Sequence, residues 1–341
     1  MKAVLFPGDS HTEIRDIEIP EPGPGEVVVR LTASGVCGTD VHYWHESAES
    51  RGDRAGVVPG HESVGVVHAV GPGVTRFEEG HRVVAGMLHI GCGHCKVCRR
   101  GEFALCGNKQ VFGRTLGGSY AEYVKAPTQA VYRLADDLPD DVAVLAACNL
   151  STAYSALRRA DVRRGESLTV FGLGGVGLCT VLIAAEEGVE VVAVDPLAER
   201  RAKATALGAA AVLDPEELGA MIARDGFGTD VAIECSGHPA AQKQSIDVLV
   251  PGGRTVVVGM GGGYNFIAEE IIGKKATLMG TLVCRPDEFY DVLEFAGGHV
   301  DELRTLLGPR ITIDSVDEGL RHSQDGGEGK VLFDWTVGKS S

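Results

Sequence analysis

Four cysteines lie close together in one short stretch of the chain, where they could surround a metal ion. Two residues separate Cys92 from Cys95 and Cys95 from Cys98, and seven more precede Cys106. Four thiolates complete the tetrahedral coordination of Zn²⁺, so a zinc ion held by them has no open position and is structural. An iron–sulfur cluster is the alternative, but nothing else in the chain indicates electron transfer. We predict a structural zinc site, with His94 solvated inside the loop.

A second motif has the pattern of a dinucleotide-binding turn. Residues 167–171, SLTVF, are apolar and strand-like, and they run directly into the sequence GLGGVG and an apolar helical segment. In this pattern the first glycine permits the tight turn, the second lets the backbone approach a pyrophosphate, and the third allows close packing of strand and helix. Free N–H groups at the start of the helix bind the anion. The predicted cofactor-binding residues are Gly172, Gly174, Gly175, Val176 and Gly177.

Asp195 follows the next strand candidate, residues 190–194. It lies about 20 residues beyond the glycine turn, where an acidic residue binds the ribose hydroxyls of the cofactor. Because its carboxylate would repel a 2′-phosphate, NAD is favoured over NADP. Arg200 and Arg201 keep NADP as an alternative, since an arginine can accommodate the extra phosphate.

Three further residues with metal-binding side chains are dispersed along the chain: Cys37, His61 and Cys148. Taken singly, a buried cysteine or histidine is more often a core residue than a ligand. The remaining cysteines have no metal-binding spacing, and we predict that they are small buried residues: Cys179, Cys235 and Cys284.

The elements that must position these residues fall into two regions. Short β-branched segments separated by Gly and Pro predict a β-rich first region, without a helix before about Asp141. Its strand candidates are residues 26–31, 62–70, 81–84 and 119–126. From Ser167 onward, apolar strands alternate with helical segments, which predicts an α/β fold with a doubly wound parallel sheet. The six strand candidates there are 167–171, 190–194, 211–213, 231–234, 255–258 and 277–281. The tail predicts a helix at 287–296 and a strand at 330–335, and it is too short to fold alone.

Composition limits the classes of partner. A chain of 341 residues is long enough for two domains. The formal charge of −15 disfavours nucleic acid. No apolar run is long enough to cross a bilayer, and the N-terminus lacks the pattern of a signal peptide. We therefore expect a cytoplasmic protein with a small-molecule substrate and neither membrane nor nucleic acid as a partner.

Taken together, the motifs resemble the zinc-containing medium-chain dehydrogenase/reductase family, which includes alcohol, polyol and threonine dehydrogenases. The resemblance covers essentially the whole chain. It rests on the segment from Cys37 to His42, GHE at 60–62, the four-cysteine stretch, GLGGVG at 172–177 and GKKATLMGT at 273–281. It implies a GroES-like catalytic domain made of residues 1–149 and 284–341, and a Rossmann NAD-binding domain at 150–283.

The resemblance also implies roles for individual residues. Cys37, His61 and Cys148 would hold a catalytic zinc with one open position, where the metal acts as a Lewis acid on the substrate oxygen. The hydroxyl of Thr39 would take the proton of the alcohol and pass it through the ribose to His42, which exchanges it with water. The remaining roles implied are orientation of His61 by Asp40, transient approach to the metal by Glu62, and packing against the nicotinamide by Thr152.

The substrate class is less defined than the reaction. The segment from Cys37 to Trp44 is similar to the polyol dehydrogenases, yet that branch commonly has a glutamate where this chain has Cys148. His81 and Asn149 also depart from the family pattern. Candidate walls of a substrate pocket are Tyr43, Trp44, His45 and Leu88.

We predict a zinc-dependent oxidoreductase that transfers a hydride between NAD(H) and an alcohol or polyol and its ketone or aldehyde. The expected complement is two zinc ions per chain, one catalytic and one structural, with NADP as the less favoured cofactor. The alternatives are a zinc-free quinone or enoyl reductase of the same superfamily and a non-catalytic NAD-binding homologue. By analogy with the family, a homodimer or homotetramer is expected through the edge of the Rossmann sheet.

Overall fold

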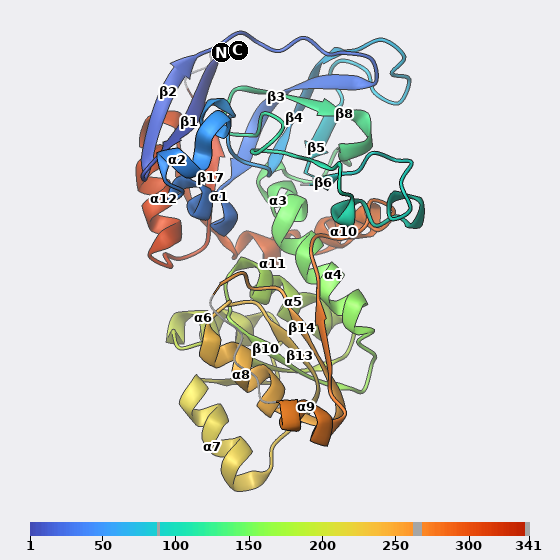
Figure 1. The fold of residues 1–341 in the computed structure, drawn as a ribbon, viewed down its shortest axis with the longest axis vertical. Coiled ribbons are helices and arrows are strands. Elements are labelled where there is room, and N and C mark those ends of the chain that lie inside the picture. The colour runs from blue at the N-terminus through green and yellow to red at the C-terminus, as the bar shows by residue number, and fades with distance from the viewer. Residues whose placement is uncertain (87–88, 262–267, 338–341) are drawn as a thin grey trace. The chain divides into compact units, whose positions relative to one another are not determined.

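The computed structural model describes residues 1–86, 89–261 and 268–337 (Figure 1). The chain forms two compact units, of which the first contains Met1–Cys148 and Arg285–Ser341 and the second Asn149–Cys284. Asn149 and Cys284, which the sequence-based boundaries assigned to the catalytic domain, belong to the second unit. The Asn149 carboxamide lies against Gly175 of that unit, where a Cβ would be 2.5 Å from Asn149 Nδ2.

The first unit is built around a seven-stranded, largely antiparallel sheet in the order β16-β17-β3-β4-β5-β9, with β8 also paired to β3. Its strands are β3 (Glu26–Gly35), β4 (Ser63–Val70), β5 (Arg82–Ala85), β8 (Tyr123–Pro127), β9 (Val131–Arg133), β16 (Leu307–Ile311) and β17 (Lys330–Asp334). Every residue of β3 except Glu26, Arg30 and Thr32 is buried, because neighbouring strands and helices cover it. Strand β17 pairs antiparallel with β3, so the last strand of the chain completes a sheet begun by its first third.

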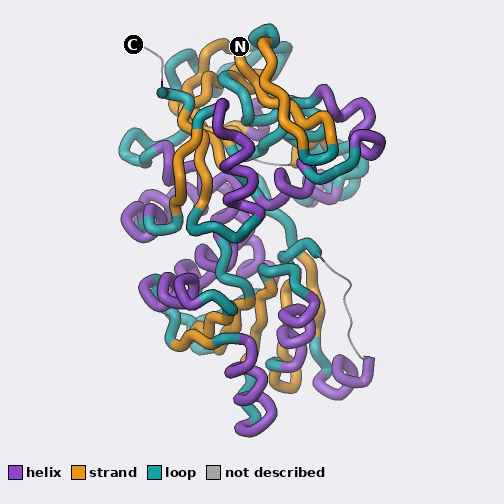
Figure 2. The backbone as a smooth tube through the Cα atoms, turned by 90° about the vertical axis from the view of Figure 1, so that its left-hand side faces the viewer, coloured by secondary structure: helices purple, strands orange, loops and turns teal. Residues whose placement is uncertain are grey.

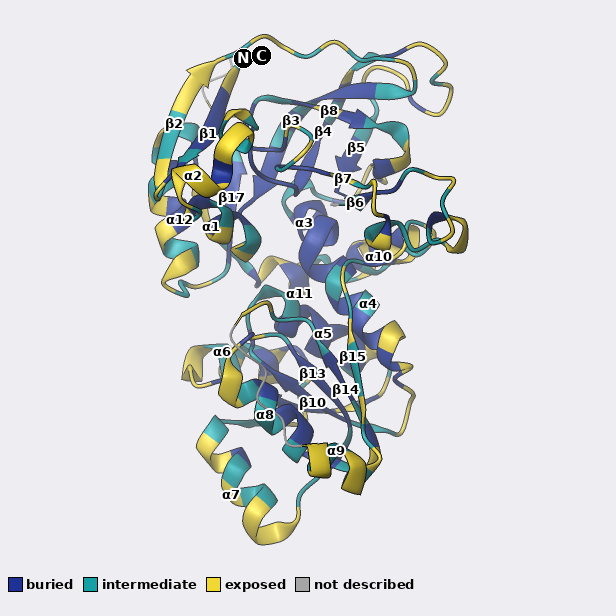
Figure 3. Cartoon of the chain, viewed as in Figure 1, coloured by how far each residue is buried: buried dark blue, intermediate teal, exposed yellow. Residues whose placement is uncertain are grey.

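Smaller elements surround this sheet. A hairpin of β1 (Lys2–Gly8) and β2 (His11–Asp16) forms one two-stranded sheet, and β6 (His89–Ile90) pairs with β7 (Gln110–Val111) in another. The helices of the unit are α1 (Gly38–Trp44), α2 (Ala48–Arg51), α3 (Asp140–Leu145), α10 (Phe289–Gly298), α11 (Val300–Arg304) and α12 (Val316–Gln324). Figure 3 shows α3 mostly buried, from Val142 to Leu145, whereas α2 is largely exposed.

The expectation of no helix before about Asp141 is wrong, because α1 and α2 precede it. Helix α1 begins directly after Cys37, whose backbone N–H donates to the Asp40 carboxylate at 2.9 Å. The Cys37 side chain in turn accepts from the Asp40 backbone, which makes a reciprocal cap at the helix start. Sequence signatures of this cap use serine or threonine, so a cysteine in the first position hides it.

The second unit contains a six-stranded parallel sheet in the order β12-β11-β10-β13-β14-β15. Its strands are β10 (Ser167–Phe171), β11 (Glu190–Val194), β12 (Ala211–Leu213), β13 (Thr229–Glu234), β14 (Leu249–Val257) and β15 (Thr277–Gly280). Strand order reverses on either side of β10, which is the topological switch point where doubly wound sheets bind dinucleotides. The predicted α/β class with a doubly wound parallel sheet is confirmed.

One helix precedes the first of these parallel strands and the others connect them, and Figure 2 shows helices flanking the sheet. They are α4 (Ser151–Ala160), α5 (Gly175–Glu186), α6 (Ala198–Ala206), α7 (Pro215–Asp225), α8 (Pro239–Asp247) and α9 (Ala268–Lys274). Helix α5 is buried from Gly177 to Ala184, as an apolar helix in the centre of a unit should be. Among the residues that the structure describes, no helix is both long and apolar enough to span a membrane.

Candidate active site and metal centres

Two turns and one helix of the first unit bring the dispersed donor residues together. Strands β3 and β4 pair antiparallel with Ser34 opposite Ser63. The last residues of β3 and the first residues of β4 therefore lie at the same end of the sheet. Cys37 follows β3, and His61 precedes β4. Cys148 lies in the π-helical turn Ala146–Leu150 that follows α3. The donor atoms of Cys37, His61, Glu62 and Cys148 all lie within 4.8 Å of one another.

His61 is oriented by a buried carboxylate. Its Nδ1 lies 3.3 Å from Asp40 Oδ1, and both side chains are buried. The other oxygen, Asp40 Oδ2, accepts from the phenol of Tyr120 at 3.1 Å and from the Cys37 backbone at 2.9 Å. Burial and the charge of Asp40 raise the pKa of Tyr120, so its O–H stays protonated and remains a donor. This arrangement leaves Nε2 of His61 as the nitrogen available to a metal.

A hydrogen bond joins the two thiols of the cluster. Their sulfur atoms lie 3.9 Å apart. The hydrogen bond from Cys148 lowers the pKa of Cys37 well below its ordinary value, and the same hydrogen bond, together with burial, raises the pKa of Cys148. A thiolate is therefore already favoured at one of the two sulfurs, which is the form that ligates a metal.

Glu62 occupies the fourth position of the cluster and is paired with a lysine that sequence reasoning missed. Lys330 Nζ lies 2.5 Å from Glu62 Oε1, and both side chains are buried. Burial lowers the pKa of Lys330, but Glu62, Cys37 and Cys148 together outweigh the effect of burial, and the net shift is upward. Lys330 belongs to no recognised motif. The one feature of the sequence that could indicate it is its position at the start of the predicted strand 330–335, in a tail too short to fold alone.

The residues present fit a zinc ion. His61 Nε2 is buried and, within the described part of the chain, has no hydrogen-bond partner. Two sulfurs and one imidazole nitrogen match the N and S ligands that Zn²⁺ prefers, and the Cys₂His set is the one known for alcohol dehydrogenases. Cys37, His61 and Cys148 would hold the ion. Glu62 would be either a fourth ligand or a neighbour of the open position.

Helix α1 carries the two residues of the predicted proton path. Thr39 is half-buried and His42 is exposed on the same short helix, so His42 can exchange protons with solvent. The predicted pocket residues differ in their surroundings. Trp44 is buried, while His45 is engaged with Ser10 at 2.7 Å and Gln324 at 3.1 Å. Arg114 lies over the ring of Tyr43 at 4.6 Å; Leu88 lies outside the described residues.

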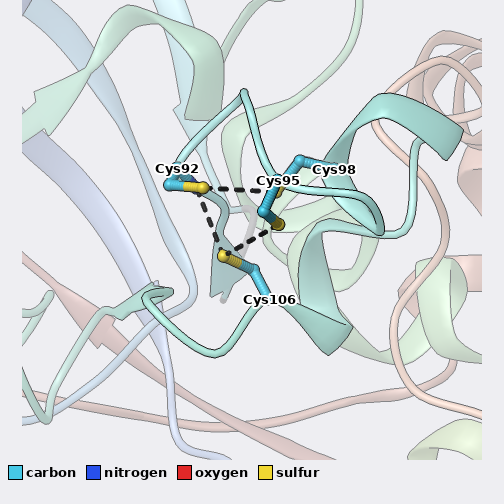
Figure 4. A group of neighbouring side chains, drawn as sticks. All are labelled: Cys92, Cys95, Cys98 and Cys106. Carbon is cyan, nitrogen blue, oxygen red and sulfur yellow. Dashed lines mark hydrogen bonds between the residues drawn. The ribbon is translucent and has the colours of Figure 1, made fainter.

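The four-cysteine stretch forms a compact loop in which the side chains converge (Figure 4). The Sγ atoms of Cys95 and Cys106 are 3.8 Å apart, and those of Cys92 and Cys98 are 4.0 Å apart. The donor atoms of all four lie within 4.8 Å of one another. A backbone N–H lowers the pKa of Cys95, which favours the thiolate that a metal binds. His94 is exposed and its Nδ1 lies 2.9 Å from the Cys92 carbonyl oxygen, apart from the sulfur group.

The glycine turn connects β10 to α5 in the second unit. A Cβ on Gly177 would lie 1.9 Å from the carbonyl oxygen of Gly172, so strand and helix approach too closely for any side chain. A Cβ on Gly174 would meet no atom within 4 Å, which leaves open space at the start of the helix. Gly175 and Val176 open α5, whose first N–H groups have no partners inside the helix. Open space beside N–H groups that lack helical partners is what a pyrophosphate would need at this turn.

Asp195 closes the other side of this turn. It follows β11 and is only 3% exposed. Its Oδ2 accepts from the backbone of Leu173 at 2.8 Å, and its Oδ1 accepts from Leu197 at 2.9 Å. Arg200 Nη1 lies 3.8 Å from Asp195 Oδ2. Arg201 donates to the carbonyl oxygens of Asp195 and Pro196 at 2.7 and 2.9 Å, so Arg201 is occupied by the backbone.

Thr152 lies in the first turn of α4 and is partly buried. It belongs to the second unit, as does Asn149, whose Nδ2 would lie 2.5 Å from a Cβ on Gly175. Asn149, which departs from the family pattern, contacts the glycine turn of the second unit through its carboxamide.

Comparison with known proteins identifies the family. Residues 23–136 match the alcohol dehydrogenase GroES-like domain, and residues 175–297 match the zinc-binding dehydrogenase domain. An alcohol dehydrogenase of Rhizobium meliloti strain 1021 is 34% identical over 293 residues, which cover 83% of this chain and 84% of the relative. An L-threonine 3-dehydrogenase of Rhizobium rhizogenes strain K84 is 33% identical over 327 residues, covering 94% of both chains.

The solved structures agree. The alcohol dehydrogenase TADH from Thermus sp. ATN1 has a TM-score of 0.87 at 29% identity, over 98% of this chain and 99% of that one. The fold and the site therefore define an oxidoreductase with a GroES-like domain and a Rossmann domain. The chain belongs to the zinc-containing medium-chain dehydrogenase family, as its motifs predict.

Proposed function

We propose that this chain is an NAD-dependent zinc alcohol dehydrogenase that interconverts an alcohol or polyol with its ketone or aldehyde. The observation that carries the proposal is the convergence of Cys37, His61 and Cys148, three zinc-type donors from distant segments, within 4.8 Å of one another. The four-cysteine loop is the proposed structural metal site, so the cluster of Cys37, His61 and Cys148 is not needed for that role. A three-ligand site is the arrangement that leaves a position for chemistry.

In this proposal each residue has a defined task. Zinc, when bound, supplies the Lewis acidity that favours loss of the alcohol proton and polarises the carbonyl in the reverse direction. Asp40 holds the His61 ring with Nε2 directed at the cluster, and Tyr120 holds Asp40. The hydroxyl of Thr39 accepts the proton released by the substrate. His42 delivers that proton to water from its exposed position on α1.

The choice of NAD rests on Asp195. A ribose 2′-hydroxyl can donate to its buried carboxylate, whereas a 2′-phosphate would bring a second negative charge against it. Arg200 lies 3.8 Å from the same carboxylate, so its charge is largely engaged in that pair. NADP remains the alternative cofactor, and the comparison of the two cofactors is part of the test.

Secondary alcohols and polyols are the proposed substrates. The extensive similarity to an L-threonine 3-dehydrogenase supports β-hydroxy amino acids as a second candidate class, because threonine is itself a secondary alcohol. The two classes differ in charge near the reacting carbon. A substrate panel therefore separates them more directly than any single compound.

The test combines metal analysis with turnover. Purified protein is assayed for zinc, and NADH and NADPH absorbance is followed with secondary alcohols, polyols and L-threonine. We expect two zinc ions per chain, one for each donor group, and turnover with NAD that exceeds turnover with NADP. One zinc ion and no turnover would contradict the proposal and favour a zinc-free reductase or a non-catalytic NAD-binding protein.

A further inference from the structure

Lys330 and Glu62 form an ion pair inside the first unit, beside the proposed catalytic metal. Glu62 is 0% exposed and Lys330 is 8% exposed. The lysine opens β17, whose pairing with β3 places the last strand of the chain next to the strand that leads to Cys37. A buried charge is tolerated when an opposite charge lies at hydrogen-bond distance, and here Nζ and Oε1 are 2.5 Å apart.

Glu62 leaves open whether the metal would have three or four protein ligands. Its carboxylate lies within 4.8 Å of the donors of Cys37, His61 and Cys148. Its second oxygen, Oε2, is buried and has no hydrogen-bond partner in the described part of the chain. Four protein ligands would close a tetrahedral zinc site, whereas three leave the position that catalysis requires. Something in the site must therefore decide whether the carboxylate binds the metal.

Gly35 fixes the path of both charged side chains. A Cβ on Gly35 would lie 1.9 Å from Glu62 Oε2 and 2.8 Å from Lys330 Cε. The carboxylate and the lysine stem therefore lie directly against bare backbone at the end of β3. The backbone at the end of β3 therefore bounds the ion pair on one side.

We propose that Lys330 is a positioning residue that holds Glu62 beside the catalytic metal rather than on it. The inference rests on the proposed function, because it assumes a metal at this cluster. Two thiolates balance the charge of Zn²⁺, and Lys330 balances Glu62. Binding of the carboxylate to the metal would divide its charge between two cations and weaken its hold on the buried ammonium, which is unfavourable. Without the lysine, the metal becomes the nearest cation for Glu62.

The experiment follows coordination directly, with cobalt in place of zinc. Co²⁺-loaded wild-type protein and Lys330→Met are titrated with imidazole, and the visible absorption of the cobalt is recorded. Imidazole is neutral, so a change in the charge of the site does not by itself alter its binding. We expect imidazole to shift the wild-type spectrum. In Lys330→Met its affinity should fall at least about tenfold, because Glu62 takes the open position.

A double variant, Glu62→Gln with Lys330→Met, removes both charges together and leaves no buried charge unpaired. We expect it to bind imidazole within about threefold of wild type, since neither protein has Glu62 on the metal. An unchanged affinity in Lys330→Met would overturn the proposal. A rise of about tenfold or more in the double variant would also overturn it, by showing that Glu62 is already a ligand. That comparison stands even if Lys330→Met alone does not fold.

Failure of the proposed function gives a different result. If the dispersed cluster binds no metal, wild-type protein takes up cobalt only at the four-cysteine loop. Its spectrum is then that of a four-thiolate site and does not respond to imidazole in any variant. This outcome overturns both proposals, whereas the outcomes above overturn the role of Lys330 alone.

Discussion

Cys148 is the donor whose loss most directly separates the two metal sites. In Cys148→Ala we expect zinc content to fall by one ion per chain and kcat/KM to fall at least about 100-fold, because two protein ligands hold the metal poorly. Metal analysis and steady-state kinetics on the same preparation measure both. Cys179→Ala is the control, since Cys179 is buried in α5 and belongs to neither donor group. Full activity in Cys148→Ala would refute its role as a ligand.

Asp195 is the residue proposed to set the choice between NAD and NADP. Asn at this position keeps an oxygen that can accept from the Leu173 backbone and removes the charge that opposes a 2′-phosphate. In Asp195→Asn we expect the ratio of kcat/KM for NAD to that for NADP to fall at least about tenfold. Asp225→Asn, an exposed acid paired with Arg224, is the control for a change in net charge alone. An unchanged ratio in Asp195→Asn would argue against this role.

Among the residues of the site, those carried by local motifs could be predicted and those defined by distant contacts could not. The residues of the GHE motif are adjacent in the sequence, and the four cysteines of the loop lie within 15 residues, so local spacing identifies both. Lys330 is separated from Glu62 by most of the chain, and only the pairing of β17 with β3 brings them together. Tyr120 is similar, because its phenol reaches Asp40 across the fold. Neither side chain has a spacing that could reveal it.

At the level of elements, the end of β3 sets the geometry of the cluster. In Gly35→Ala the added methyl group would overlap Glu62 Oε2, at 1.9 Å, and Val144 Cγ1, at 2.8 Å. We expect a loss of about 1–3 kcal/mol in the free energy of unfolding, as for other overpacked cores. Weaker retention of the second zinc ion should accompany this loss. Denaturant unfolding and metal content after dialysis measure the two effects.

Gly56→Ala provides the matched control for that substitution. A Cβ at Gly56 would meet no atom within 4 Å, and its φ is not in the left-handed region. The control should therefore unfold like wild type. Equal stability of Gly35→Ala and Gly56→Ala would mean that the Glu62–Lys330 pair is not confined by the strand as the structure has it.

The strands of the second unit were predictable because each is a short apolar run bounded by turn residues. All six candidates correspond to strands. In five of them both the first and the last residue lie within two residues of the observed bounds. The exception is β14, which starts at Leu249 rather than 255, because the Pro251–Gly253 segment disguises its first half. In the first unit the hairpin of β1 and β2 was missed, since β2 is mostly exposed and has no apolar periodicity.

For the whole molecule, the edge of the parallel sheet is the proposed site of self-association. Strand β15 pairs with β14 on one side and ends the sheet on the other. The backbone of Thr281 donates toward β14, so in an extended strand the alternate amide of Leu278 points away from it. Leu278→Pro removes that outward donor, and we expect a dimer or tetramer to dissociate. Light scattering measures the mass, with Leu278→Val as the control that keeps the N–H.

The first unit draws on both ends of the chain, and this has a consequence for the order in which metals can be acquired during synthesis. The four-cysteine loop is local and can close around its ion as soon as it leaves the ribosome. The strand that carries Lys330 is made after all four donor residues of the cluster, so Glu62 has no lysine beside it until β17 has paired with β3. A ribosome-bound chain stalled before β17 has left the ribosome should therefore bind the second zinc with Glu62 as a ligand, whereas the chain that contains a folded β17 should keep the carboxylate on Lys330. Imidazole binding to cobalt-loaded stalled and finished chains would reveal this, and equal affinities would exclude it.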